Sequence, residues 1–159
     1  VSGGAEATGA PTNSSSVSVF DSSAGSGSAP TLDWTGETNF SGDGIHPDSD
    51  VSGTTFEFRV EYTDADNDAP ARIQLWIDED QNDAYSDSEK YAMSEDGGGA
   101  DYTAGRFFTK SLTLTCAGGC DLNYRFYATD GTNEATDFTP VSDSTVSVTC
   151  GNHCTNCIQ

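Results

Sequence analysis

Strict alternation of apolar and polar side chains over residues 55–62 (TFEFRVEY) is the feature that most limits how this chain can fold. In an extended segment this pattern places four side chains on one face: Phe56, Phe58, Val60 and Tyr62. No long stretch carries apolar residues at helical spacing, because Gly, Thr, Asn and Asp interrupt every candidate. The sequence therefore predicts strands and no substantial helix.

Six further segments show strand patterns and are separated by turn-forming residues. In the segment RIQLWI, Ile73, Leu75 and Ile77 share one face and Trp76 lies on the other. The predicted strands span residues 31–34, 55–62, 72–77, 90–94, 106–116, 120–129 and 144–149, of which 90–94 is short and typical of a sheet edge. This pattern predicts an all-β fold, a sandwich of about seven strands.

Two appendages flank this body, which covers residues 29–149. Residues 1–28 form an extended N-terminal arm, because residues 1–30 hold 14 Gly and Ser, a composition that cannot bury a core. Within the arm, residues 14–20 alternate small polar with apolar side chains and predict one short strand, with Val17, Val19 and Phe20 as its apolar members. Residues 150–159 form a short cysteine-rich C-terminal tail.

The charge of the chain is strongly negative. Asp and Glu number 26 against 6 Lys and Arg, which gives a formal net charge of −20 and makes nucleic acid and anionic membranes poor partners. No apolar run reaches the roughly 20 residues of a membrane span, and no apolar leader follows Val1, so we expect a processed chain without a span. Residues 43–101 hold 17 of the 26 acids, which indicates either a need for carboxylates there or a solvated surface.

Four strings resemble the immunoglobulin-like and fibronectin-III-like modules of secreted bacterial and archaeal surface proteins: TLDWTG, FEFRVEYTDADNDAP, QLWID and YRFYATDGTNEAT. The most specific part is the penultimate strand, in which Tyr124, Phe126 and Ala128 alternate ahead of Asp130 and Gly131. The resemblance covers about residues 29–149 and implies an immunoglobulin-like β-sandwich, without implying an activity. The chain departs from antibody-type domains because residues 55–62 contain no cysteine for an inter-sheet disulfide.

Two acidic loops carry candidate calcium ligands. In IDEDQNDAYSDSEK, oxygen-bearing side chains occupy positions 1, 3, 5, 9 and 12 of an EF-hand-type loop: Asp78, Asp80, Asn82, Ser86 and Glu89. Asp83 stands where such loops usually have glycine, and no helices flank the loop, so an unliganded acidic turn is the alternative.

The second loop joins the second and third predicted strands and resembles the calcium linkers of cadherin-like modules. It contains Asp64, Asp66 and Asp68, and in sandwich topology it shares one end of the molecule with the loop that carries Asp130. Carboxylates that meet there repel each other unless a cation neutralises them. Calcium is therefore the one cofactor that the sequence predicts, with an unliganded turn again as the alternative.

Five cysteines indicate an oxidising, extracellular or cell-surface location. Cys116 and Cys120 flank Ala-Gly-Gly between two predicted strands, and a hairpin there predicts a local disulfide. The tail leaves one thiol over after any single pairing, which indicates a bond to another chain, a free thiol or a missing partner: its cysteines are Cys150, Cys154 and Cys157. Irregular spacing around His153 disfavours zinc, and Ile158 stands where covalent haem attachment needs histidine.

The sequence contains few residues or motifs that are typical of an active site. His46 and His153 are the only histidines, and no GxSxG, P-loop or HExxH string occurs. With 26 acids some carboxylate pair always lies near a catalytic separation, so such pairs are uninformative. We therefore expect no enzyme and no organic cofactor.

Surface chemistry leaves a binding role open. Four aromatic residues are candidates for a sugar-binding face, although such residues more often pack in a core or at an edge: Trp34, Trp76, Tyr85 and Tyr102. Asn13 and Asn39 each begin an N-glycosylation sequon, a pattern that also arises by chance.

The sequence as a whole favours a structural role, an extracellular filament or surface-layer subunit that assembles with copies of itself. In this hypothesis residues 14–20 of one copy add as a strand to the next copy, head to tail, with Val17 and Val19, or Phe20 on the opposite face, inserted into it. The result is an open filament with the organisation of a donor-strand pilus. Two alternatives remain. Residues 14–20 are the first strand of their own sandwich, or the chain is a carbohydrate-binding or adhesive module.

Overall fold

The structure, a computed structural model, describes residues 27–136 and 139–151. The predicted donor strand at 14–20, with Val17, Val19 and Phe20, lies outside the described residues. Asn13, His153, Cys154 and Cys157 lie outside them as well.

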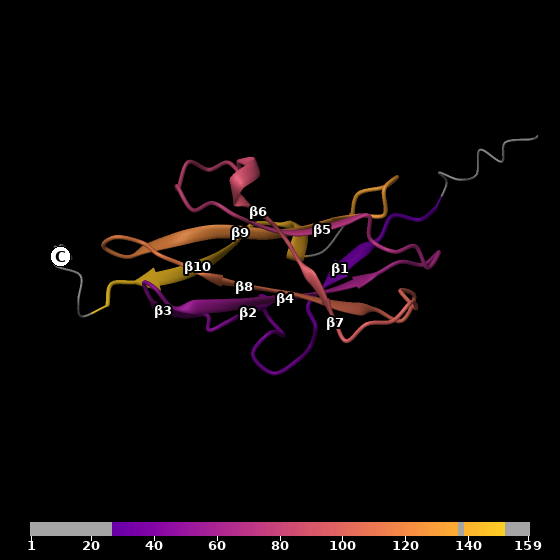
Figure 1. Cartoon of the computed structure of the whole chain (residues 1–159), viewed down its shortest axis with the longest axis horizontal. Coiled ribbons are helices and arrows are strands. Elements are labelled where there is room, and N and C mark those ends of the chain that lie inside the picture. Colours follow the sequence, from indigo (N-terminus) through magenta and orange to yellow (C-terminus); the bar gives the residue numbers. More distant parts are fainter. Residues whose placement is uncertain (1–26, 137–138, 152–159) are drawn as a thin grey trace, which may run out of the picture.

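The described chain is an all-β sandwich of two five-stranded sheets (Figure 1). The first sheet has the order β1-β4-β8-β7, and β2 also pairs with β4. Its strands are β1 (Thr31–Asp33), β2 (Ile45–His46), β4 (Thr55–Thr63), β7 (Ser94–Asp96) and β8 (Arg106–Thr113). The second sheet has the order β3-β10-β9-β5-β6. It comprises β3 (Ser49–Val51), β5 (Arg72–Ile77), β6 (Lys90–Ala92), β9 (Cys120–Thr129) and β10 (Ser144–Thr149).

Most strands that pair in the two sheets are not consecutive in the chain; the consecutive pairs are β5–β6, β7–β8 and β9–β10. Only the β3–β10 pair among the described strands is parallel. No described residue lies in an α-helix, and the two 3₁₀ turns are η1 (Asp87–Glu89) and η2 (Thr139–Val141). The all-β sandwich prediction is confirmed.

Alternation explains the core. In β4 every second residue from Phe56 to Tyr62 is fully buried, and β9 repeats the pattern from Leu122 to Ala128. The ring of Phe58 meets that of Tyr124 edge-on at 5.3 Å between centroids, which links the two sheets. Burial of such side chains is the main favourable term in folding, at about 25 cal/mol per Å² of apolar surface.

Three strand predictions were wrong in detail. The single strand predicted at 90–94 is two strands in different sheets, β6 and β7, because Met93 between them is buried and its N–H donates to the Ile73 carbonyl. The strand predicted at 106–116 ends at Thr113, since Leu114 exchanges backbone hydrogen bonds with Gly53 and Thr54. β2 and β3 were not predicted, because two or three residues are too few to show a period.

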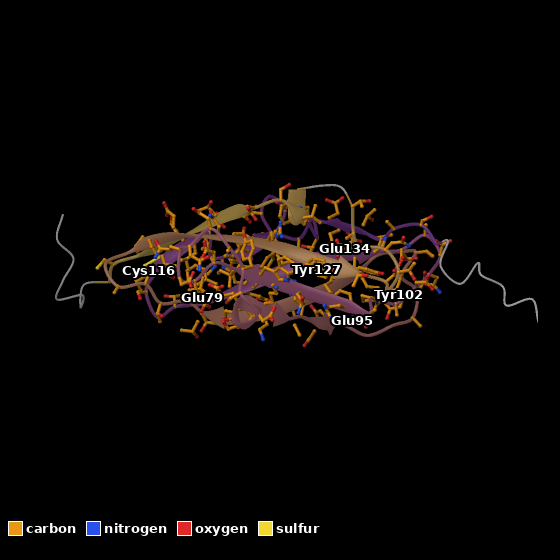
Figure 2. The ribbon with its side chains drawn as sticks, turned by 90° about the horizontal axis from the view of Figure 1, so that it is seen from above. Glu79, Glu95, Tyr102, Cys116, Tyr127 and Glu134 are labelled. Carbon is orange, nitrogen blue, oxygen red and sulfur yellow. A yellow bond between two sulfur atoms is a disulfide. The ribbon has the colours of Figure 1, made fainter. Side chains whose placement is uncertain are left out.

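The disulfide between Cys116 and Cys120 is present, with 6.0 Å between the Cα atoms, but the predicted hairpin around it was wrong. β8 and β9 belong to different sheets, so the disulfide spans a connection that crosses from one sheet to the other. Cys150 is also disulfide-bonded. Figure 2 shows Cys116 near one end of the sandwich and Tyr102 near the other.

The sandwich is elongated, and the described chain enters and leaves it at opposite ends (Figure 1). The entry end carries Gly27 together with the loops that follow β4 and β9. We call it the aspartate end, because Asp64, Asp68 and Asp130 meet there. The exit end carries Cys150 and the Cys116–Cys120 bridge, and we call it the disulfide end.

Candidate functional site

Asp64 is the first residue after β4 and organises the loop that follows. Its carboxylate Oδ1 accepts hydrogen bonds from the backbone N–H groups of Asp66 (2.9 Å) and Asp68 (3.1 Å). This is the local side-chain-to-backbone bonding for which Asp is favoured in turns. Asn67 completes the turn in the left-handed region at φ 66°. The side chain of Asp64 is thereby fixed in orientation and buried, with only 1% of it exposed.

The other carboxylate oxygen of Asp64 is different. Oδ2 is buried and has no hydrogen-bond partner among the described residues. The neighbouring hydroxyl of Tyr62 has a single proton, which it donates to the backbone carbonyl of Asp68 at 3.1 Å. Buried carboxylate oxygens are normally hydrogen-bonded, so an unpartnered one requires an explanation.

Asp68 and Asp130 bring two more carboxylates to Asp64. One oxygen from each of the three side chains lies within 4.8 Å of the others, as the shared position of these loops in a sandwich predicts. Asp68 is exposed and Asp130 is half-buried, so the cluster opens to solvent on one side. Asp66, the fourth predicted ligand in these loops, is not part of the cluster.

Asp130 is held by its own turn. Its Oδ1 accepts from the backbone N–H groups of Thr132 and Asn133, and these bonds lower the pKa of Asp130. The Asn133 side-chain amide donates to Asp130 Oδ2 and to the backbone carbonyl of Gly27, each at 3.1 Å. The cluster is thus adjacent to the first residues of the described chain.

A second contact joins the same residues to the aspartate loop. The backbone N–H of Ser28 donates to Asp66 Oδ2, which explains why Asp66 points away from the cluster. A Cβ added to Gly27 would lie 3.2 Å from Asp66 Oδ2, so the backbone approaches the loop closely there. No local sequence pattern marks Asn133 or Gly27, because both act through long-range contacts.

The electrostatic field at this end is uncompensated. None of the ion pairs within residues 27–136 and 139–151 involves Asp64, Asp68 or Asp130. The pKa of the Tyr62 hydroxyl is raised, first by burial and then by the charges of these three carboxylates. A further negative charge, on the Tyr62 hydroxyl, is therefore strongly disfavoured beside these three carboxylates.

The second predicted loop also brings carboxylates together. Asp78, Asp80 and Glu89 each offer an oxygen within 4.8 Å of the others, and Asp78 and Glu89 are buried. Asp83, at the position where EF-hand-type loops usually have glycine, has a left-handed backbone at φ 60°. Three of the five predicted ligands therefore converge.

The two buried carboxylates of this second loop accept a hydrogen bond on every oxygen. Both oxygens of Asp78 accept backbone N–H groups, from Asn82 and Asp83. Glu89 Oε1 accepts from the N–H groups of Glu79 and Asp80, and Oε2 from the N–H and hydroxyl of Ser86. The amide oxygen of Asn82 accepts the Ala84 N–H. The loop thus compensates its two buried carboxylates with its own donors.

Replacing Glu89 with glutamine is expected to destabilise the protein at neutral pH and to lose this effect in acid. The Ser86 hydroxyl and N–H bonds lower the pKa of Glu89 below its ordinary value of 4.5. A carboxylate whose folded pKa is lowered stabilises the fold above its unfolded pKa, and that contribution disappears as pH falls through the folded pKa. Urea unfolding of both proteins at about pH 7 and about pH 3 measures the difference. Asp87→Asn, at an exposed neighbour, is the control. If Glu89→Gln lowers the free energy of unfolding by the same amount at both pH values, the prediction is wrong.

The aromatic candidates mostly serve the fold. Trp34 packs edge-on against Phe126, and Tyr102 edge-on against Tyr62. On the outer face of the second sheet, Trp76 stacks on Tyr127 with 4.8 Å between ring centroids. Figure 2 shows Tyr127 beside Glu134. The Tyr127 hydroxyl donates a hydrogen bond to Glu134 Oε1, with 2.9 Å between the two oxygens.

Charged neighbours enclose Trp76 further. The guanidinium of Arg125 lies 4.7 Å and the amine of Lys90 4.9 Å from the ring centroid. Both are its cross-strand neighbours. Arg125 also lies 5.1 Å from the ring of Tyr85. These contacts form a cross-strand ladder of cation–π pairs, and they occupy the ring that a sugar would need for stacking.

The remaining predicted residues are placed as follows. Asn39 is exposed in the turn before β2, with φ 77°. His46 is exposed and packs edge-on against Phe40. Among the described residues, His46 belongs to neither carboxylate cluster.

No protein-family model matches this chain, and a search of curated proteins found no match. Among the described residues, no helix has the length and apolar character needed to cross a membrane.

Proposed function

We propose that the chain is a structural subunit of an extracellular filament or surface layer, in which residues 14–20 of one copy add as a strand to the next. The observation that carries this proposal is the position of the two ends. The chain enters the elongated sandwich at the aspartate end and leaves it at the disulfide end (Figure 1). Copies joined by an N-terminal arm therefore line up along the long axis, which is a head-to-tail, open-ended arrangement.

The completeness of the sandwich indicates how the strand is added. The core residues from both sheets are between 0% and 8% exposed, so the described body does not depend on a donated strand to fill its core. Strands β1, β2, β3, β6 and β7 are at sheet edges. An incoming segment would use the free main-chain groups of such an edge.

The length of the arm limits where the neighbour lies. Phe20 and Gly27 are seven residues apart in the sequence, and an extended chain spans about 3.5 Å per residue, so the donated strand ends within about 25 Å of the aspartate end. The place beside β4 that a first strand of the same sandwich would take is already filled by β1 and β2. This argues against residues 14–20 as a first strand beside β4 of their own sandwich.

The disulfides support the location. Disulfides form and persist in oxidising compartments, and Cys116, Cys120 and Cys150 are all disulfide-bonded. The carbohydrate-binding alternative has less support, because the ring of Trp76 is already enclosed by Tyr127, Arg125 and Lys90.

Deleting residues 1–24 is expected to give a folded monomer that forms no filaments, whereas the full chain assembles. The body keeps its complete core, so circular dichroism and the melting temperature remain those of a folded sandwich. Negative-stain microscopy and light scattering measure assembly. A peptide spanning residues 13–21 is expected to bind the truncated body.

Point variants of the full chain provide a matched control. The pair Val17→Asp and Val19→Asp places charges on the apolar face of the donated strand and is expected to abolish assembly. The pair Ser16→Asp and Ser18→Asp adds the same charge on the other face and is expected to leave assembly largely intact. Filaments of normal length from the truncated chain, or a full chain that stays monomeric under all conditions, would contradict the proposal.

A further inference from the structure

We infer that Asp64, Asp68 and Asp130 bind one calcium ion at the aspartate end of the sandwich. The three side chains come from two loops that are far apart in the sequence, and the fold brings them together. Two oxygens on one calcium ion are separated by at most twice the metal–oxygen distance of 2.3–2.6 Å, or about 5 Å. The three carboxylate oxygens, all within 4.8 Å of one another, satisfy that limit.

The unpartnered oxygen of Asp64 is the observation that points to a cation. Asp64 is 1% exposed, and its Oδ1 is fixed by two backbone N–H groups, so its Oδ2 is held in place without a donor. No ion pair among the described residues reaches the cluster. A cation supplies both the missing partner and the missing positive charge.

The donor set favours calcium among the common cations. All three ligands are carboxylates, which suit hard cations, whereas zinc favours nitrogen and sulfur. One ligand is buried and two reach toward solvent, so water can fill the remaining positions of a six- to eight-coordinate ion. Magnesium requires a nearly ideal octahedron with shorter bonds, which this irregular set of loop side chains does not favour.

The second acidic loop serves as the internal comparison. Its buried carboxylates, Asp78 and Glu89, have hydrogen-bond donors on every oxygen, supplied by the loop itself. Within the described residues the same kind of cluster therefore occurs twice, once with its buried oxygens satisfied and once with a buried oxygen left over. Only the cluster of Asp64, Asp68 and Asp130 leaves a buried oxygen for a metal to satisfy.

Calorimetric titration of the full chain with calcium chloride, after removal of metals with EGTA, tests the site. We expect a binding event that Asp68→Asn and Asp130→Asn each weaken at least tenfold and that Asp64→Asn abolishes. Asp80→Asn, at an exposed residue of the other cluster, is the matched control and should leave this event unchanged. Magnesium chloride is expected to bind at least tenfold more weakly than calcium.

Melting temperatures separate a metal ligand from a residue with a structural role only. In EGTA, Asp64→Asn should be at least as stable as the wild type, because it keeps one acceptor oxygen for the two N–H groups and removes repulsion. With calcium the wild type should melt higher and Asp64→Asn should not. If Asp64→Asn fails to fold, the same comparison is made with Asp68→Asn.

Three results would overturn the inference. One is a wild-type chain that binds no calcium up to about 1 mM, the weak end for extracellular calcium modules. Another is binding that Asp80→Asn removes while the variants of Asp64 and Asp68 keep it. The third is a calcium-induced rise in melting temperature that is the same in the wild type and in Asp68→Asn and Asp130→Asn.

Discussion

Replacing Phe58 with alanine is expected to lower the free energy of unfolding by about 3–5 kcal/mol, a large part of the stability of a domain of this size. Phe58 is 0% exposed on β4, which has β8 on one side and β1 and β2 on the other. Its ring also contacts Tyr124 of the opposite sheet. Truncation removes this contact and leaves a cavity that a tightly packed core closes only in part.

Urea unfolding followed by circular dichroism measures the loss for Phe58→Ala. Phe107→Ala is the matched control, since Phe107 is an aromatic residue of the neighbouring strand β8 that is only half-buried. We expect the control to lose clearly less stability than Phe58→Ala. Equal losses would show that Phe58 contributes no more than a partly exposed ring, contrary to its place in the core.

Gly44→Ala is expected to lower the free energy of unfolding by about 2–5 kcal/mol, from two separate causes. The first is a left-handed backbone at φ 69°, which an alanine adopts only with strain. The second cause is a steric clash. An added Cβ would lie 2.5 Å from the backbone carbonyl of Arg59 and 2.9 Å from the ring of Trp34. The Gly44 carbonyl also accepts the Arg59 N–H at 2.7 Å, so the loop cannot easily move away.

Gly36→Ala is the control for this prediction. Gly36 has the same φ of 69° but no neighbouring atom within 4 Å of an added Cβ, so its substitution measures the backbone strain alone. We expect a loss of about 1–2 kcal/mol there. The difference in the free energy of unfolding between Gly44→Ala and Gly36→Ala measures the steric cost of the close contact between Gly44 and strand β4. If the two substitutions have the same effect, the loop before β2 packs less tightly on β4 than described.

The proposed calcium site lies beside Gly27 and Ser28, the first residues that the structure describes. Asp66 and Asn133, which flank the proposed ion site, are hydrogen-bonded to Ser28 and Gly27. Calcium binding and strand donation are nevertheless tested by different measurements. A chain that binds calcium without forming filaments would keep the site and exclude the proposed assembly.

The candidate ligands show how far sequence can predict a site. Sandwich topology correctly placed the loop of Asp64 beside the loop of Asp130, because the strand order could be inferred from the alternating segments. The hydrogen bonds that satisfy Asp78 and Glu89, and leave Asp64 Oδ2 without a donor, could not be predicted. They depend on the direction of individual N–H groups in turns, which residue spacing does not specify.

The sequence by itself determined most of the longer strands and which of their faces are buried. Strands β5, β9 and β10 have the bounds that alternation predicted, because a two-residue period is a local property of an extended chain with one buried face. Only the tertiary structure decided which strands pair. Residues 90–96 divide between two sheets, and the chain crosses from β8 to β9 without a hairpin. Those choices depend on hydrogen-bond partners and core contacts contributed by distant segments, such as the Ile73 carbonyl that binds Met93, and no local pattern encodes them.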